Sequence, residues 1–199
     1  MTCPAWADDR ERDPAFVAHA EAVGDAVASD STPLRVAIVN RWHRNLFKGW
    51  VPLTDYAGNM RQVTASMPCL NGDVLFGGRL GSAPGVVASE MQVLCAAINT
   101  RTQQLDRNAD GLTDEALVGA VAAAVARAVA EFIRIHPYVN GNGRTSRVLW
   151  RAVAGRLGFP ASISVGERPQ EPYVSCLHEA INGRIGPLVA RVLMTISTA

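Results

Sequence analysis

The sequence predicts an all-α protein that carries one short β-hairpin. Apolar residues recur at helical spacing through most of the chain, and only one segment combines a tight-turn signal with a strand-like run. There is no internal repeat and no low-complexity tract. With 199 residues, the chain is long enough for one domain with a substantial buried core.

The composition is that of an ordinary globular protein, with 48% hydrophobic and 19% charged residues. A formal net charge of +1 gives no overall attraction to nucleic acid or to a membrane surface, so we expect neither as a partner. The start, "MTCPAWADDRERD", is charged and does not resemble a secretory signal. The longest apolar region, "LVGAVAAAVARAVAEFI", is interrupted by Arg127 and Glu131, and we expect it to be too short and too charged to span a bilayer. These features predict a cytoplasmic protein.

Four cysteines lie far apart in the sequence: Cys3, Cys69, Cys95 and Cys176. None belongs to a CxxC pair, and no cysteine and histidine pairing has zinc-finger spacing, so a metal cluster is not expected. We expect free thiols in a reducing cytosol.

The first thirty residues (1–30) form an N-terminal extension of unknown role, with a helix expected from Pro14 to Ala28; the main domain is placed at 31–199. An amphipathic helix is expected over 34–49, followed by a loop-rich stretch. Within 66–78, Asn71-Gly72 is a two-residue hairpin turn signal and Val74-Leu75-Phe76 has strand character. The glycine-rich residues 77–85 are interpreted as a flexible connection.

The second half of the chain is predicted to be helical. We expect a helix over 86–101, a polar loop over 106–111, and a helix capped by Thr113 that ends near His136, because Pro137 disfavours helical geometry in the residue before it. This helix is apolar nearly all round, which is typical of a central core helix. Its repeated apolar positions are Leu117, Val121, Val125 and Val129. Two further regions are expected to be helical: 143–157, and 173–196 with a joint at 183–187.

The segment "HPYVNGNGRTSR", His136 to Arg147, joins the core helix to the next one. At a helix start the first N–H groups have no partner within the helix, and the helix dipole adds positive charge, so this end is a ready anion site. Gly141 and Gly143 allow the backbone to approach a ligand closely. Arg144 and Arg147 lie three residues apart and can reach one phosphate chain.

His136 can act as a base next to this anion site, because an imidazole titrates near neutral pH. Each part also has an ordinary interpretation: a structural histidine, a simple turn, or solvated arginines. Arg151 continues the arginine face by one turn, either as part of the site or as a surface charge. The order of all parts in one short segment favours the functional interpretation.

This ordered combination resembles the Fic family signature, HPF-x-[DE]-GNGR-x-x-R. The matching residues are His136, Pro137, Gly141, Asn142, Gly143, Arg144 and Arg147, with Tyr138 in place of the aromatic Phe. The segments "RWHRNLF", "AGNMR" and "YVSCLHEAINGRIGPL" also look like parts of the family, so the resemblance extends over about 34–193.

The resemblance implies a Fic-type helical bundle that moves AMP from ATP to a hydroxyl side chain of a target protein. His136 would be the general base. The amides around Gly141, Asn142 and Gly143 would hold the α- and β-phosphates, and the two arginines would neutralise the β- and γ-phosphates. Tyr138 would anchor the loop in the core, and the adenine would lie near 173–181.

The expected hairpin falls where the family has a flap that pairs with an extended stretch of the target. The alternative is a hairpin with a structural role only. The flap residues expected to bind the target are Asn71, Gly72, Asp73, Val74 and Leu75.

Asn140 departs from the family pattern, which has Asp or Glu there as the ligand of Mg²⁺. Magnesium prefers anionic oxygen ligands, so an amide oxygen should bind it more weakly. Three outcomes stay open: retained AMP transfer, transfer of another group such as phosphate or phosphocholine, and nucleotide binding without turnover.

The inhibitory motif of many family members, [ST]-x-x-x-E-[GN], is absent; the nearest match runs from Ser175 to Glu179. Either a separate inhibitory partner supplies the block, or the weak metal site makes a block unnecessary, or the protein works without one.

Overall fold

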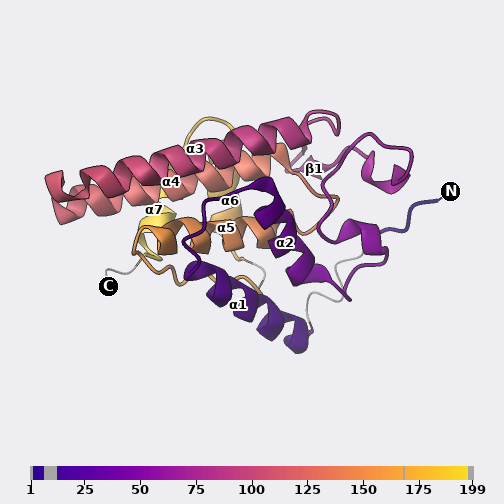
Figure 1. Ribbon diagram of the computed structural model, residues 1–199, viewed down its shortest axis with the longest axis horizontal. Helices are drawn as coiled ribbons and strands as arrows, with labels where there is room; N and C mark the ends of the chain where they lie inside the picture. The colour runs from indigo at the N-terminus through magenta and orange to yellow at the C-terminus, as the bar shows by residue number, and fades with distance from the viewer. Residues whose placement is uncertain (1, 7–12, 168, 197–199) are drawn as a thin grey trace.

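The computed structural model describes residues 2–6, 13–167 and 169–196. In this part of the chain the fold is all-α with one small sheet, as predicted (Figure 1). The helices are α1 (Pro14–Ala28), α2 (Val36–Phe47), α3 (Val87–Asn108), α4 (Asp114–Ile135), α5 (Asn142–Arg156), α6 (Tyr173–Ile181) and α7 (Gly186–Leu193). The strands are β1 (Leu75–Phe76) and β2 (Arg79–Leu80), and short 3₁₀ turns cover Thr54–Tyr56, Pro68–Leu70 and Ala109–Gly111.

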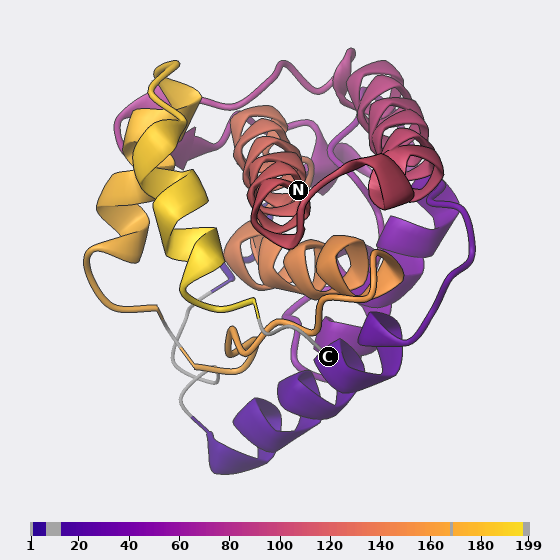
Figure 2. The ribbon, with the colours of Figure 1, turned by 90° about the vertical axis from the view of Figure 1, so that its left-hand side faces the viewer.

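Helix α4 is the centre of the bundle, as its sequence predicts. Figure 2 shows it nearly end-on, with α3 on one side, α6 and α7 on the other, and α5 crossing beneath. Its valines at 121, 125 and 129 have no exposed surface, and alanines fill most of the remaining positions. Small side chains allow the neighbouring helices to approach closely on several sides. The end of α4 therefore has a firmly held position, and the candidate site lies there.

By length and composition alone, α4 is also the one helix in the described part of the chain that could cross a membrane. The expectation that this segment is too short and too charged for that was therefore wrong. Its burial between four helices accounts for the same composition, because a core helix must be apolar on every side.

Helix α3 is longer than its sequence predicted. It continues to Asn108, and the 3₁₀ turn Ala109–Gly111 follows it where a polar loop was expected. Thr102 and Leu105 are buried, so the apolar face of the helix extends past Arg101 into the polar segment. The joint between α6 and α7 lies at Gly183–Gly186, where it was expected.

The hairpin is present, but its turn is not at Asn71-Gly72. Leu75 pairs with Leu80 and Phe76 with Arg79, so the turn is formed by Gly77-Gly78, both with positive φ (56° and 79°). The turn was thus expected six residues too early, and Gly77-Gly78, which form it, were interpreted as part of a flexible connection. Two glycines satisfy the positive φ angles of a tight hairpin turn as well as Asn-Gly does.

The expectation of four free thiols was also wrong. Cys3 and Cys69 form a disulfide across 66 residues of sequence, whereas Cys95 and Cys176 are free. The bond fastens the N-terminal segment to the 3₁₀ turn Pro68–Leu70, just before the hairpin. The expected free thiols supported a reducing compartment, and Cys3 and Cys69 no longer give that support because they form a disulfide. The cytoplasmic location stays a prediction.

Helix α1, part of the segment placed outside the main domain, shares the core of the bundle. Phe16 and Ala20 have no exposed surface, and α1 packs along α5. Arg151 of α5 lies at this contact: its guanidinium is 2.6 Å from Glu21 and 2.7 Å from Asp25. Arg151 is therefore neither a surface charge nor part of the anion site, but a buried link between α1 and α5.

Candidate active site

His136 terminates α4 in a left-handed conformation, with φ 52° and ψ 61°. It is the only residue other than glycine with positive φ in the described chain. Its ring Nδ1 lies 3.1 Å from the carbonyl oxygen of Ile133. A carbonyl oxygen only accepts, so Nδ1 carries the proton and Nε2 has the lone pair of the neutral ring. The ring is thus held in the tautomer that a base requires.

The protonation state agrees with that role. Burial, together with the nearby charge of Arg61, lowers the pKa of His136 to about 4, although the hydrogen bond to Ile133 acts in the opposite direction. At neutral pH the ring is uncharged and can accept a proton.

The loop between His136 and α5 is closed by its own side chains. Asn142 Oδ1 accepts a hydrogen bond from Tyr138 N (2.9 Å), and Asn142 Nδ2 donates to Tyr138 O (2.8 Å). The Tyr138 ring is fully buried, stacks on His43 at 3.7 Å, and donates its hydroxyl proton to Asn40. Tyr138 therefore anchors the loop in the core, as expected.

His43 supports the loop from the opposite side, a role that the sequence did not reveal. Gly58 N donates to its Nδ1 (2.9 Å), so Nε2 carries the proton and donates to Asn140 O (3.1 Å). Burial lowers its pKa to about 3, although the bond to Asn140 raises it. A neutral histidine thus holds the loop backbone. In the sequence, His43 stood out only by its place in an amphipathic helix and in the family-like segment "RWHRNLF".

The start of α5 has the form of an anion site. Gly141 precedes it with φ 77°, and no side chain caps the helix start. A Cβ at Gly141 would lie 2.4 Å from the Phe47 ring, so only glycine fits. The Gly141 amide, however, already donates to Asn140 Oδ1 (2.7 Å). Of the three amides expected to bind phosphate, that of Gly141 is engaged by the chain itself, and those of Asn142 and Gly143 lie at the uncapped helix start.

Arg144 and Arg147 both reach from α5 to the loop at 164–167. Arg144 donates to Gly166 O and lies over the Phe16 ring at 5.0 Å. Both arginines are buried. Arg147 donates to four carbonyl oxygens, those of Gly143, Ser164, Val165 and Glu167. The two side chains therefore share a face, as predicted, but they also hold a loop that the sequence did not connect to the site.

These parts meet at one cavity of about 280 Å³. One wall is the end of α4 with His136, a second is the start of α5 with both arginines, and a third is the apolar face of α6. The lining residues are Phe76, Ile133, His136, Asn140, Gly141, Gly143, Arg144, Arg147, Pro169, Tyr173, Val174 and Leu177. A cavity of this kind suits a ligand that is polyanionic at one end and flat and apolar at the other.

The residues of this cavity do not form a magnesium site. Among the described residues, none that lines the cavity is acidic, and no cluster of three or more metal-binding side chains occurs. Asn140 Oδ1, the one expected ligand, accepts from Gly141 N, while Asn140 Nδ2 donates to Trp6 O (3.3 Å). An amide oxygen engaged in this way is a poor ligand for a hard divalent cation.

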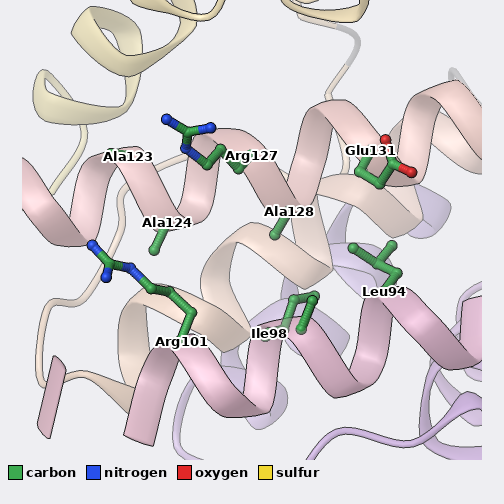
Figure 3. Close-up of a pocket in the computed structure, with 9 residues that line it drawn as sticks. Leu94, Ile98, Arg101, Ala123, Ala124, Arg127, Ala128 and Glu131 are labelled. Carbon is green, nitrogen blue, oxygen red and sulfur yellow. The ribbon is translucent and has the colours of Figure 1, made fainter. Parts of the chain in front are cut away.

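A larger cavity, of about 570 Å³, lies along the groove between α3 and α4 (Figure 3). Its floor consists mainly of Leu94, Ile98 and alanines, with Arg101 and Arg127 on opposite walls. Glu131, its one acid, pairs with Arg134 at 2.7 Å. This groove contains no base and no helix start, so the smaller cavity is the candidate active site.

The sequence model of the Fic/DOC family matches residues 33–154. The chain belongs to the Fic/DOC family. Its Fic signature spans the end of α4 and the start of α5, the two elements that meet at the smaller cavity.

Curated Fic relatives include a protein adenylyltransferase fic-1 of Caenorhabditis briggsae, 37% identical over 92 residues, which are 45% of this chain and 18% of that protein. Another is the protein adenylyltransferase Fic of Nematostella vectensis, 37% identical over 59 residues, or 30% of this chain and 14% of that protein. The chain thus spans less than a fifth of the length of these two relatives.

Solved structures show the same fold. BepC, a VirB-translocated effector of Bartonella tribocorum with bound AMPPNP, has a TM-score of 0.66 at 14% identity over 97% of this chain and 89% of that one. A Fic domain containing signaling protein of Bacteroides thetaiotaomicron has a TM-score of 0.60 at 21% identity, over 98% and 71%. At these identities the similarity establishes the fold.

The hairpin lies beside the cavity of about 280 Å³. The rings of Phe76 and His136 are 5.8 Å apart, and the Phe76 ring also packs on His178 of α6 at 4.7 Å. Leu75 and Leu80 expose 68% and 64% of their surface. Among the other residues expected in the flap, Gly72 and Val74 are tied by their carbonyl oxygens to Arg61 and Gly81. Asn71 is exposed, and Asp73 lies near the Arg61 charge.

Glu179, the nearest approach to an inhibitory glutamate, pairs with Arg184 at 3.3 Å and not with Arg147. Ser175 bonds to Glu171. These contacts belong to α6 and its ends, so the segment from Ser175 to Glu179 does not block the cavity.

Proposed function

We propose that this protein transfers AMP from ATP to a hydroxyl side chain of a target protein. One observation carries the proposal. His136, with its protonated Nδ1 held by Ile133, lines the same cavity as the uncapped start of α5 and its two arginines. A base and a polyphosphate seat on adjoining walls suit the transfer of a phosphate-linked group to a nucleophile.

In this reaction His136 Nε2 accepts the proton of the target hydroxyl as its oxygen attacks the α-phosphorus of ATP. The new oxygen–phosphorus bond forms AMP-modified protein, and the bond to the β-phosphate breaks, so that pyrophosphate leaves. The helix start at Asn142 and the charges of Arg144 and Arg147 stabilise the negative charge on the phosphates. The adenine lies against the apolar face of α6 at Tyr173, Val174 and Leu177.

Mg²⁺ belongs to this proposal as part of the ATP substrate, since none of the described residues that line the cavity is acidic. The phosphates and water would provide nearly all of its coordination. A separate inhibitory partner and a cytoplasmic location also remain proposals.

The contacts of Asn140 favour one alternative, nucleotide binding without turnover. Its amide is bonded on both sides, to Gly141 N and to Trp6 O, and gives the cavity no anionic oxygen. The nucleotide would then be held by the α5 start while the chemical step is lost.

The test is incubation of the protein with α-labelled ATP and cell lysate. We expect a labelled band that His136→Ala abolishes, since loss of a general base costs about 10²–10⁴-fold in rate. His19→Ala is the matched control, because His19 is exposed on α1 and bonds only to Asn45 O. Absence of label with the unmodified protein, under varied metals and nucleotides, would contradict the proposal.

Calorimetry separates the two functions. ATP binding that survives His136→Ala, without product from either protein, supports a binding-only regulator. Asn140→Asp then tests the metal: an increase in Mg²⁺-dependent labelling shows that the amide limits turnover. No increase shows that the metal does not contact residue 140.

A further inference from the structure

We propose that Arg61 is the positioning residue that fixes the flap (residues 72–82) relative to the catalytic base His136. This rests on the proposed function, because it concerns how the target hydroxyl is presented to that base. The guanidinium of Arg61 joins the flap, which would bind the target, to the end of α4, which carries the base.

Arg61 has no exposed surface. Its guanidinium donates to four backbone carbonyl oxygens: Nε to His136 (2.9 Å), Nη1 to Gly72 (3.2 Å), and Nη2 to Ser82 (2.6 Å) and Ile135 (3.1 Å). Within the described chain no acidic side chain forms an ion pair with it. The planar fork of an arginine can serve several acceptors in fixed directions, whereas a lysine ammonium cannot.

A fully buried cation surrounded by neutral carbonyls is costly, and burial lowers the pKa of Arg61, while the charge of Asp73 raises it. An apolar side chain of similar volume would avoid this cost. The carbonyls explain why arginine is present: two are the last ones of α4, which have no partner within the helix and lie at the negative end of its dipole.

The first pair of bonds holds the catalytic end. Ile135 O and His136 O flank the residue whose backbone is left-handed, a conformation that side chains disfavour. Arg61 N also donates to Pro137 O (2.7 Å). The segment that carries the base is therefore bound on both sides of His136 by one residue from outside α4.

The second pair holds the flap at its base. Gly72 and Ser82 are the two ends of the flap, and the carbonyl oxygens of both accept hydrogen bonds from the same guanidinium. Ser82 N also donates to Ile135 O (3.1 Å). A Cβ at Gly81 would lie 2.7 Å from His136 Cβ and 3.0 Å from Arg61 Nη2, so the returning strand runs directly against the base.

Arg61 does not line the cavity of about 280 Å³. It therefore does not contact ATP or the target and is not a catalytic residue. A target strand bound to the exposed edge of the flap would have its distance to His136 set by this guanidinium. Loss of Arg61 should thus affect the presentation of the hydroxyl and leave nucleotide binding intact.

The experiment compares Arg61→Lys and Arg61→Met with Arg156→Lys. Arg156 is a half-buried arginine that also donates to a backbone carbonyl oxygen, that of Thr32, but it is the last residue of α5, far along the helix from the site. The readouts are amide hydrogen exchange at Gly81 and Ser82, the NMR titration of His136, ATP binding by calorimetry, and labelling of lysate at saturating ATP.

For both Arg61 variants we expect at least tenfold faster exchange at Gly81 and Ser82 and at least tenfold slower labelling, with the Kd for ATP within twofold of the unmodified protein. Arg61→Met should also raise the pKa of His136, because a neighbouring positive charge is lost. Arg156→Lys should change none of these. Unchanged flap exchange with wild-type labelling in Arg61→Lys would overturn the proposal, and so would a parallel loss of ATP affinity.

If Arg61→Met does not fold, Gly81→Ala is the second variant, since it displaces the flap from His136 and keeps the cation. We expect the same combination of faster flap exchange, slower labelling and unchanged ATP affinity; wild-type behaviour would contradict the coupling. If the unmodified protein labels nothing, the proposed function fails, whereas the exchange and titration results still decide the role of Arg61.

Discussion

Arg61 and Arg147 both donate to backbone carbonyl oxygens, but only Arg147 lines the cavity of about 280 Å³. Each is buried, and among the described residues each donates to four backbone carbonyl oxygens. Arg61 lies at the C-terminal end of α4, where the helix dipole favours a cation, and it is shut off from the cavity. Arg147 lines the cavity near the positive N-terminal end of α5, beside Arg144. The comparison teaches that hydrogen bonds alone do not reveal the role of an arginine. Its position relative to the helix dipoles and to the cavity does.

The largest effect should come from the backbone at the α5 side. Gly141→Ala is expected to lower the free energy of unfolding by about 2–4 kcal/mol, because a left-handed alanine is strained and its Cβ meets the Phe47 ring. Gly143→Ala is the control: its Cβ would meet only Arg147, at 3.7 Å, and a helical alanine should leave stability unchanged or raise it by up to about 1 kcal/mol. Urea denaturation measures both. Equal losses would show that the α5 start tolerates no side chain at all.

A smaller effect separates the two arginines directly. Arg147→Lys should weaken ATP binding about tenfold, since one charge-assisted pair to phosphate is lost or lengthened, about 1.4 kcal/mol. Arg61→Lys should change that Kd by less than about twofold, because Arg61 lies outside the cavity. Calorimetry with both folded variants is the measurement. Similar losses of ATP affinity in the two variants would contradict the different roles assigned to Arg61 and Arg147.

The smallest effect concerns the support behind Arg147. Burial disfavours the charge of Glu21, but hydrogen bonds from Ser164 and Gly166 and the charge of Arg151 outweigh it, so the pKa of Glu21 is lowered. A lowered folded-state pKa stabilises the protein above the unfolded pKa, and this stability is lost as pH falls through the folded value. The urea midpoint should therefore fall between about pH 5 and about pH 3, and less steeply in Glu21→Gln.

His136 and His43 act in the same direction, since burial lowers the pKa of both below 6.5. Their neutral forms stabilise the fold, and that contribution declines as pH falls below the ordinary histidine value. Both histidines are present in the unmodified protein and in Glu21→Gln. The difference between the two proteins in how steeply the urea midpoint falls with pH therefore isolates the contribution of Glu21. If the urea midpoint fell equally steeply with pH in the two proteins, Glu21 would not hold the 164–167 loop.

Local signals in the sequence predicted the all-α fold and the bounds of α4 correctly. Thr113 and Pro137 bound α4 because capping and steric restriction by proline act between neighbouring residues. The hairpin turn was misplaced because Asn-Gly and Gly-Gly carry similar local signals, and at Asn71-Gly72 the backbone is engaged by Arg61 instead. Arg61 lay in the family-like segment "AGNMR", but nothing in the sequence indicated its role, since its partners are carbonyl groups that every residue possesses.

The sequence by itself determined the periodic helices, the glycine-bounded start of α5, the signature from His136 to Arg147, and hence the family. The tertiary structure alone decided which tautomer of His136 the protein holds, that Asn140 is bonded to Trp6, that Cys3 pairs with Cys69 across 66 residues, and that Arg61 joins the flap to the end of α4. The physical reason is range. Propensity and capping act over a few residues, whereas buried polar groups are satisfied by whichever partners the packed chain brings near.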